Sequence, residues 1–402
     1  MKNYKSPSNF DGYSIKCYDK TYSLINFSPG PAPISVNVFN KVKEDIFTNS
    51  NFVFGNTPLE MSHRSPEFNE IINNVNKKIR NLMQIPDDFN IIWTQGGGHA
   101  QFSSIPLNMK TIDGFKKAAY LVTGTWSSRA FNESKKFIES ENLLEYFYQN
   151  KQIIEYNKIP ANFSIPSGID YVYLCSNETV NGIEFKSYLN RTVLNGAKLF
   201  VDMSSDFLMK KINWDNIDGA FACTSKNMGV AGANILIIRK NIIESLNNNY
   251  IPCVLDWKLY SDSNSLYNTP AVFNIYLIEQ IIDNYINEMQ TIENMNDYSI
   301  KKSNIFYDFL DNNNLFHSVV KDKNSRSIVN IPFIVGDGDE KIMSRFLEYC
   351  YLNNIVGLRT LTPFSYKSLG LVEPLRVSFY NGISIDDVHQ LIEIMKSFIL
   401  IE

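Results

Sequence analysis

The stretch KLFVDMSSDFLMKKINWDNIDGAFACTSKN, residues 198–227, decides how this chain is expected to fold. Residues 198–201 form a short apolar run that is typical of a buried strand, and Asp202 follows it directly. Residues 219–224 form a second such run, and Lys226 follows it. The two polar residues are 226 − 202 = 24 positions apart, about one strand–helix–strand unit. Because parallel strands end at a common sheet edge, we expect both side chains to meet there.

The same alternation extends in both directions from this stretch. Further strands are predicted over 90–94, 118–123, 171–175 and 234–239, and helices over 36–47 and from Gln101 onward. Strands separated by helices indicate an α/β fold with a large, mostly parallel sheet that is covered on both faces. In such folds, ligands bind beyond the carboxyl ends of the strands.

The pattern changes after residue 270. Residues 273–310 have apolar side chains at helical spacing, 341–353 and 385–401 are amphipathic helices, and 327–335 and 375–380 are strand candidates. We therefore predict a large domain over 23–270 and a smaller α+β domain over 271–402. Residues 1–22 form a polar N-terminal lead.

Composition excludes several classes of protein. The chain has 402 residues, of which 44% are hydrophobic, so it is not a disordered protein. Its 38 basic and 42 acidic side chains give a net charge of −4, which argues against a general nucleic-acid binder. There is no signal-peptide pattern and no apolar run of about 18 residues, so we expect a soluble cytoplasmic protein that does not bind a membrane.

Cysteine and histidine are too scattered to form a local metal-binding motif, so no metal site is predicted. The five cysteines have no Cys-x-x-Cys spacing and are interpreted as reduced thiols of a cytosolic protein. They are Cys17, Cys175, Cys223, Cys253 and Cys350.

A carboxylate and an amine at one sheet edge suit pyridoxal phosphate. The lysine, Lys226, would form a Schiff base with the cofactor, and Asp202 would pair with the pyridinium nitrogen. The alternative from spacing alone is a surface ion pair, which contributes about 0–1 kcal/mol.

Other strand ends also carry candidate residues. The glycines 96–98 open a helix and could hold a phosphate, although a tight turn explains them equally well. Trp126 could stack on a planar ring or belong to the core. Thr179 could reach a ring substituent, or its segment could be an ordinary helix cap.

Nine ordered segments resemble the phosphoserine aminotransferase family, a group of class V pyridoxal-phosphate-dependent aminotransferases. The resemblance implies the aspartate-aminotransferase-like fold, called fold type I, and extends from residue 26 to residue 381. The segments are NFSPGPA (26–32), EMSHRS (60–65), QGGGHAQF with IPLN (95–102, 105–108), TGTWS (123–127), CSNET (175–179), DMSSD (202–206), SKN (225–227), YNTP (267–270) and LRVSFYN (375–381).

The resemblance implies roles for individual residues around the cofactor. Lys226 would bind the cofactor covalently and move protons, and Asp202 would pair with the ring nitrogen. Trp126 would stack on the ring, and Thr179 would reach the ring hydroxyl. The phosphate would be held by Gly98, His99 and Ser225, and by Asn268 and Thr269 from the partner subunit of a homodimer.

The resemblance also implies how the substrate is held. Arg376 would grip the substrate α-carboxylate with a bidentate pair of hydrogen bonds. His63 and Arg64 would reach across the dimer interface to the distal anion of the substrate. The small-molecule substrates implied are glutamate and a phosphorylated or acidic keto acid, as in serine biosynthesis.

The chain departs from the family pattern most clearly between Gly357 and Arg376. The family has a short segment with a His-Arg pair there, whereas this chain is longer and lacks the pair. Arg359 or Lys367 is a candidate to supply the missing charge. Two milder departures are His99, where many members have Arg, and Ser225, where Gln is common.

Two readings of the function therefore stay open. In the first, the chain transaminates 3-phosphohydroxypyruvate with glutamate. In the second, it is a divergent aminotransferase that acts on another acidic or phosphorylated substrate in a specialised pathway, or a class V lyase.

Overall fold

The computed structural model describes residues 24–47, 57–144, 159, 164–247, 250–358 and 373–401. Within them the helices are α1 (Val36–Phe47), α2 (Pro66–Met83), α3 (Gly98–Met109), α4 (Thr125–Ser134), α5 (Arg191–Leu194), α6 (Lys240–Ser245), α7 (Trp257–Asp262), α8 (Val272–Met289), α9 (Ile292–Asp311), α10 (Glu340–Leu352) and α11 (Ile385–Ile399). The strands are β1 (Ile25–Asn26), β2 (Phe89–Gln95), β3 (Lys117–Leu121), β4 (Glu139–Asn142), β5 (Tyr171–Cys175), β6 (Asn177–Glu178), β7 (Ile183–Glu184), β8 (Lys198–Asp202), β9 (Gly219–Cys223), β10 (Ala233–Arg239), β11 (Phe316–Ser318), β12 (Asn330–Val335), β13 (Ile355–Val356) and β14 (Leu375–Ser378).

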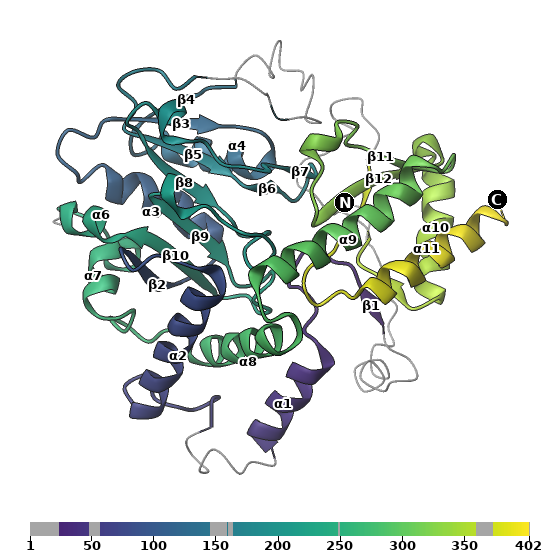
Figure 1. Ribbon diagram of the computed structural model, residues 1–402, viewed down its shortest axis with the longest axis horizontal. Helices are drawn as coiled ribbons and strands as arrows, with labels where there is room; N and C mark the ends of the chain where they lie inside the picture. The colour runs from purple at the N-terminus through teal and green to yellow at the C-terminus, as the bar shows by residue number, and fades with distance from the viewer. Residues whose placement is uncertain are drawn as a thin grey trace, which may run out of the picture.

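A seven-stranded sheet lies at the centre of the larger half of the molecule (Figure 1). Its strand order is β2-β10-β9-β8-β5-β3-β4. Strands β9, β8, β5, β3 and β4 pair in parallel, whereas β10 is antiparallel to both of its neighbours. Residues 224–232, between β9 and β10, are too few for the helical crossover that a parallel pair needs. The predicted α/β fold with a mostly parallel sheet is confirmed.

This topology brings five strand ends to one edge of the sheet. Strand β2 is antiparallel to β10 and therefore runs in the same direction as β3, β5, β8 and β9. The last residues of these five strands, and the segments that follow them, include every strand-end residue that the sequence singled out. The edge is thus the place where a site can be assembled.

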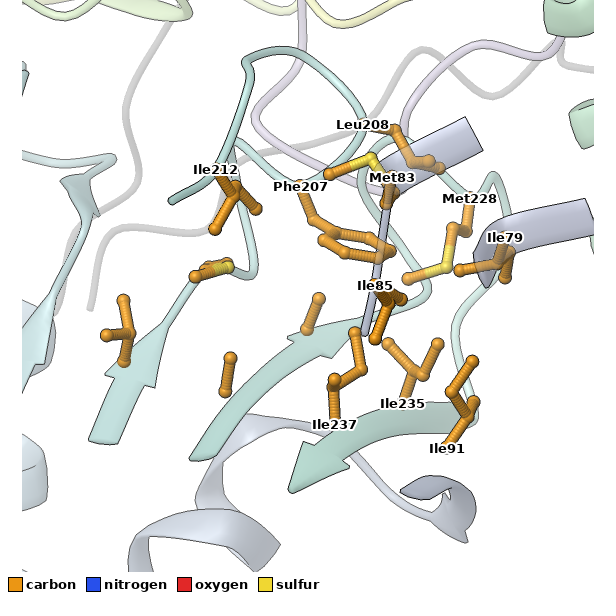
Figure 2. Close-up of a cluster of buried hydrophobic side chains, with 14 of the residues drawn as sticks. Ile79, Met83, Ile85, Ile91, Phe207, Leu208, Ile212, Met228, Ile235 and Ile237 are labelled. Carbon is orange, nitrogen blue, oxygen red and sulfur yellow. The ribbon is translucent and has the colours of Figure 1, made fainter. Parts of the chain in front are cut away.

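Helix α2 covers one face of the sheet with an apolar stripe. Figure 2 shows its last turns, where Ile79 and Met83 belong to the same cluster as Ile91 of β2 and Ile235 and Ile237 of β10. All five side chains are at most 9% exposed. This burial fixes the strands whose ends carry the site.

The smaller half contains a three-stranded antiparallel sheet, β11-β12-β14, and the helices α9, α10 and α11 (Figure 1). Its core is rich in phenylalanine, with Phe316 and Phe346 in edge-to-face contact at 4.9 Å between ring centroids. The first strand, β1, pairs in parallel with β13, so residues 25–26 pack against this half.

The helical pattern predicted over 273–310 is two helices rather than one. Gln290 has φ +65°, which ends α8, and Thr291 caps α9 by accepting a hydrogen bond from the Asn294 backbone at 3.2 Å. The apolar face of α8 packs in the core of the large half, while the far end of α9, from Phe306, packs in that of the small half. The domain limits drawn from the sequence stay a prediction.

Length and apolar character together would be needed for a helix to cross a membrane. Among the described residues, no helix combines the two.

Candidate functional site

A cavity of about 210 Å³ opens at the shared edge of the sheet. Seven of its wall positions are residues that the sequence analysis assigned to the cofactor: Gly98, His99, Trp126, Thr179, Asp202, Ser225 and Lys226. The full set of lining residues is Gly97, Gly98, His99, Phe102, Trp126, Cys175, Asn177, Thr179, Asp202, Ser204, Ser205, Cys223, Ser225 and Lys226. Residues up to 129 positions apart in the sequence thus meet at one place (226 − 97 = 129).

Asp202 is the buried carboxylate of the cavity, with an exposed fraction of 4%. It accepts a hydrogen bond from the Ser204 backbone at 2.9 Å and one from the Tyr173 hydroxyl at 3.4 Å. Burial raises the pKa of Asp202 to about 6, although the Ser204 bonds and the charge of Lys226 act in the opposite direction. A cation placed in the cavity would therefore be attracted to this carboxylate.

Lys226 enters the cavity between two aromatic rings. Its Nζ lies 6.0 Å from the ring centroid of Trp126 and 5.9 Å from that of Tyr380. Gly30 makes room for its chain, because a Cβ there would lie 3.2 Å from the Ser225 carbonyl oxygen and 3.5 Å from Lys226 Cδ. Gly30 also has φ +132°, which side chains rarely adopt.

Trp126 is tied to the opposite wall through Thr179. The indole Nε1 donates a hydrogen bond of 2.6 Å to the Thr179 hydroxyl. Arg376, on β14 of the small half, donates from Nη1 to the Thr179 carbonyl oxygen. Arg376 is only 4% exposed, so the small half delivers a buried guanidinium to the edge of the cavity.

Glu178 is a buried residue whose function sequence reasoning missed. Its carboxylate accepts hydrogen bonds from the Trp126 and Ser127 backbones at 2.8 Å each and from the Ser127 hydroxyl at 2.6 Å. It therefore caps the first turn of α4, the turn that carries Trp126. Burial raises the pKa of Glu178 to about 7. A Cβ on Gly124 would lie 2.6 Å from Glu178 Cδ, so glycine is needed there.

Replacing Glu178 should destabilise the first turn of α4, which carries Trp126. Glu178→Ala leaves two buried N–H groups without an acceptor, and each orphaned group costs about 1–3 kcal/mol. We expect the free energy of unfolding of the cofactor-free protein to fall by roughly 2–5 kcal/mol, measured by urea denaturation. Glu133→Ala, which removes an acidic residue of the same helix paired with Lys136, is the control and should change it by less than about 1 kcal/mol. Equal effects of the two substitutions would contradict the capping role.

The N-terminus of α3 forms the phosphate-sized end of the cavity. The helix begins at Gly98, three residues before the predicted start at Gln101, because only Gly96 (φ +90°) is in a turn conformation and Gly97 is the cap. Burial and the charge of Arg129 lower the pKa of His99, against the influence of Glu133. His99 is thus neutral near pH 7, and the helix dipole and backbone N–H groups supply the attraction for an anion.

Besides Arg376, which only borders it, four predicted residues do not line this cavity. Arg64 is exposed, and His63 is buried beside it, with its pKa lowered by burial and by Arg64. Asn268 accepts a hydrogen bond from the Tyr260 hydroxyl at 3.1 Å, and the Thr269 carbonyl accepts one from the Gln95 side chain. The chain does not bring these residues to its own Lys226. Arg359 and Lys367 lie outside the described residues.

The cavity fits a flat heteroaromatic ring that carries a phosphate. The Asn177 Oδ1 atom is buried in its wall and has no hydrogen-bond partner among the described residues, so it is ready to accept one. A buried carboxylate, a helix N-terminus and an indole in the wall of one cavity match the ring nitrogen, the phosphate and the ring face of pyridoxal phosphate.

Comparison with known proteins agrees with this geometry. The family model described as aminotransferase class-V matches residues 24–391. A probable phosphoserine aminotransferase of Caenorhabditis elegans is 34% identical, over 93% of this chain and 96% of its own length. A phosphoserine aminotransferase of Buchnera aphidicola is 33% identical, over 93% and 98%.

Solved structures give the same result. Phosphoserine aminotransferase from Bacillus circulans subsp. alkalophilus superposes with a TM-score of 0.83 at 27% identity, over 93% of this chain and 98% of that one. The pyridoxal-phosphate-bound phosphoserine aminotransferase from Trichomonas vaginalis superposes with a TM-score of 0.82 at 30% identity, over 93% and 99%.

Proposed function

This chain belongs to the class V aminotransferase family, and we propose that it interconverts 3-phosphohydroxypyruvate plus L-glutamate and O-phospho-L-serine plus 2-oxoglutarate. As a member of that family it is a transaminase, and its cofactor is pyridoxal 5′-phosphate. The observation that carries the proposal is the convergence of Lys226, Asp202, Trp126 and Thr179 in one cavity beside Arg376. Curated relatives that match 93% of this chain are named phosphoserine aminotransferases.

The residues of the cavity divide the work of holding the cofactor. Asp202 would face the ring nitrogen as a carboxylate, and the Trp126 indole would cover one ring face. The Thr179 hydroxyl, which accepts a hydrogen bond from Trp126 Nε1, would bond the ring hydroxyl. The first turn of α3, with Ser225, would hold the phosphate.

Lys226 performs the proton transfers. When bound, the cofactor withdraws electrons from the carbon that carries the amino group, which makes the hydrogen on that carbon acidic. Lys226 would hold the cofactor through its side-chain amine, and the same Nζ would take up that proton and return it. The rings of Trp126 and Tyr380 keep Nζ in a partly apolar space.

Arg376 orients the substrate by its α-carboxylate. The guanidinium is planar and buried, and a bidentate pair with a carboxylate fixes both distance and angle. Glutamate and phosphoserine share this α-carboxylate and differ in the distal anion. The cations proposed for the distal anion are His63 and Arg64 from the partner subunit, together with Arg359 or Lys367.

The choice of substrate tests the proposal directly. If Lys367 replaces the missing His-Arg pair, Lys367→Ala removes one charge-assisted hydrogen bond, worth about 1.5–3 kcal/mol. The value of kcat/KM for phosphoserine, with 2-oxoglutarate as acceptor, should then fall by roughly 10- to 150-fold. The value for glutamate should fall less, because a singly charged carboxylate needs fewer cations. Lys341→Ala, outside the 357–376 segment, is the control.

Each outcome separates one reading from another. High wild-type turnover of phosphoserine that Lys367→Ala leaves unchanged would mean that the other cations suffice. Poor turnover of phosphoserine with good turnover of another acidic amino acid would favour the divergent aminotransferase. Release of ammonia with a keto acid would identify a lyase.

We propose further that the protein acts as a cytoplasmic homodimer with shared sites. Asn268 and Thr269 lie away from the Lys226 of their own chain, on a segment that also exposes Tyr267 by 47%. Leu59, just before His63 and Arg64, is 60% exposed. In the proposed dimer, the partner subunit would cover these two apolar side chains together with the predicted site residues beside them.

A mixture of two inactive variants should recover activity if the sites are shared. In a hybrid of Lys226→Ala and Arg64→Ala protomers, one site contains both wild-type residues. Random reassociation of equal amounts should then restore about one quarter of the wild-type activity, measured after dilution from mild denaturant. The absence of any recovery, in a mixture shown to contain hybrids, would contradict sharing through Arg64.

A further inference from the structure

A buried lysine outside the cavity has a role that the reaction scheme above does not use. Lys302, on α9, has an exposed fraction of 0%. Its Nζ donates hydrogen bonds to the carbonyl oxygens of Phe379 at 3.1 Å, Tyr380 at 3.0 Å and Ile383 at 2.9 Å. Three acceptors match the three N–H bonds of an ammonium group.

Burying the Lys302 amine costs free energy, and the hydrogen bonds to the three carbonyl groups offset that cost. Burial lowers the pKa of Lys302 to about 7, and Asp387 on α11 opposes the shift only through its charge. An apolar residue would avoid this desolvation, but it would remove one donor from each of three buried carbonyl groups. Lys302 therefore fixes the conformation of residues 379–383, which we call the β14 turn.

The β14 turn connects directly to the residues that surround Lys226. The Tyr380 ring lies 5.9 Å from Lys226 Nζ, and its hydroxyl donates to the Pro29 carbonyl at 2.8 Å. The Asn381 backbone donates to the side chain of Asn227, the neighbour of Lys226, at 3.1 Å. The Asn381 side chain donates to the Leu208 carbonyl at 2.8 Å. The turn also follows β14, the strand that carries Arg376.

We propose that Lys302 is a positioning residue of the transamination reaction: its Nζ, hydrogen-bonded to three carbonyl oxygens, clamps the β14 turn so that Arg376 and Tyr380 keep their places relative to Lys226. The inference rests on the proposed function. It adds to that function a contact between α9 and the β14 turn, which follows the strand that carries Arg376 and holds Tyr380 beside Lys226.

The test is the half-reaction of the cofactor-loaded enzyme with an amino donor. Its rate is measured from the change in cofactor absorbance. The quantity compared is the maximal rate divided by the donor concentration that gives half of that rate. In Lys302→Met, we expect this ratio to fall by roughly 10- to 100-fold, because a small misplacement of reacting groups has an effect of this size. The factor should be the same for glutamate and for phosphoserine, because the clamp acts on the α-carboxylate end that both share. The absorbance of the resting enzyme should stay at its wild-type wavelength.

Met395→Ala is the matched control. Met395 is a fully buried residue of the same small-half core, so its truncation lowers stability without removing a donor to the turn. It should change the half-reaction less than about twofold. A loss in Met395→Ala equal to that in Lys302→Met would assign the effect to stability and overturn the proposal.

A second variant, Lys302→Gln, keeps the proposal testable if Lys302→Met does not fold. Lys302→Gln keeps two N–H donors and should give a loss between those of wild type and Lys302→Met. Wild-type kinetics in either folded variant would overturn the proposal, and so would failure of both to fold, because Lys302 would then be needed for folding itself. If the wild-type enzyme accepts glutamate but not phosphoserine, the proposed substrate fails while the role of Lys302 is still measured with glutamate.

Discussion

Lys226→Ala is expected to abolish the covalent link to the cofactor and to lower transamination by at least about 10⁴-fold, the upper end of what a positioned proton-transfer group contributes. The reason is that two functions depend on one amine. Lys226 is the only lysine among the residues that line the cavity, within the described part of the chain. No other amine of the described wall can take its place, so the loss should not be partial.

The measurement is reduction with borohydride, followed by mass spectrometry of the digested protein. The wild type should carry the reduced cofactor on the peptide that contains Lys226, and Lys226→Ala should carry none. Lys258→Ala, which removes an exposed lysine paired with Asp262, is the control and should keep both adduct and activity. An adduct that persists on another lysine of Lys226→Ala would show that the assignment is wrong.

The part of the site that could be predicted from sequence lies at strand ends. Asp202 and Lys226 come at the ends of short apolar runs. A parallel sheet brings such positions together because neighbouring parallel strands end at the same edge. The alternative of a surface ion pair does not hold for Asp202, which is buried in the cavity wall. Trp126 and Thr179 also line the cavity, and their individual roles stay predictions.

The part that could not be predicted depends on packing between distant segments. Arg376 reaches the Thr179 carbonyl from a different sheet, 376 − 179 = 197 residues away, and local periodicity contains no record of such a contact. In the sequence, Tyr380 is one residue of a predicted strand and Lys302 is one residue of a predicted helix. Only the fold shows that the Tyr380 ring lies near Lys226 and that Lys302 bonds the Tyr380 carbonyl. Glu178 was visible as part of a strand-end segment, but its target, the first turn of α4, was not.

Asp202→Asn is expected to lower the affinity for the cofactor or kcat/KM, and to raise the free energy of unfolding of the cofactor-free protein. Truncating one partner of a buried charge pair costs about 2–5 kcal/mol, so cofactor affinity or kcat/KM should fall by roughly 30- to 4,000-fold. In the empty protein, the charge of Lys226 offsets part of the cost of burying this carboxylate. A pKa of about 6 instead of the usual 3.8 corresponds to a burial cost of about 3 kcal/mol at most.

The pH dependence gives this prediction its sign. Between about pH 4 and pH 6 the folded wild-type protein binds more protons than the unfolded chain, so its stability falls as the pH rises through that window. Asp202→Asn lacks this titration. Its advantage in urea denaturation of the cofactor-free protein should therefore be absent near pH 4, grow up to pH 6 and stay constant above it.

The matched control is Asp218→Asn, at the opposite edge of the same sheet. Asp218 is also buried, but it is paired with Arg191 at 2.6 Å, so its replacement should lower stability at pH 8 and leave cofactor affinity unchanged. Opposite signs of the two stability changes would show that Asp202 is a carboxylate kept for a cationic ligand and not for the fold. If Asp202→Asn destabilised the empty protein at pH 8 as Asp218→Asn does, Asp202 would be a structural residue, and the cation that we assign to this cavity would lose its main support.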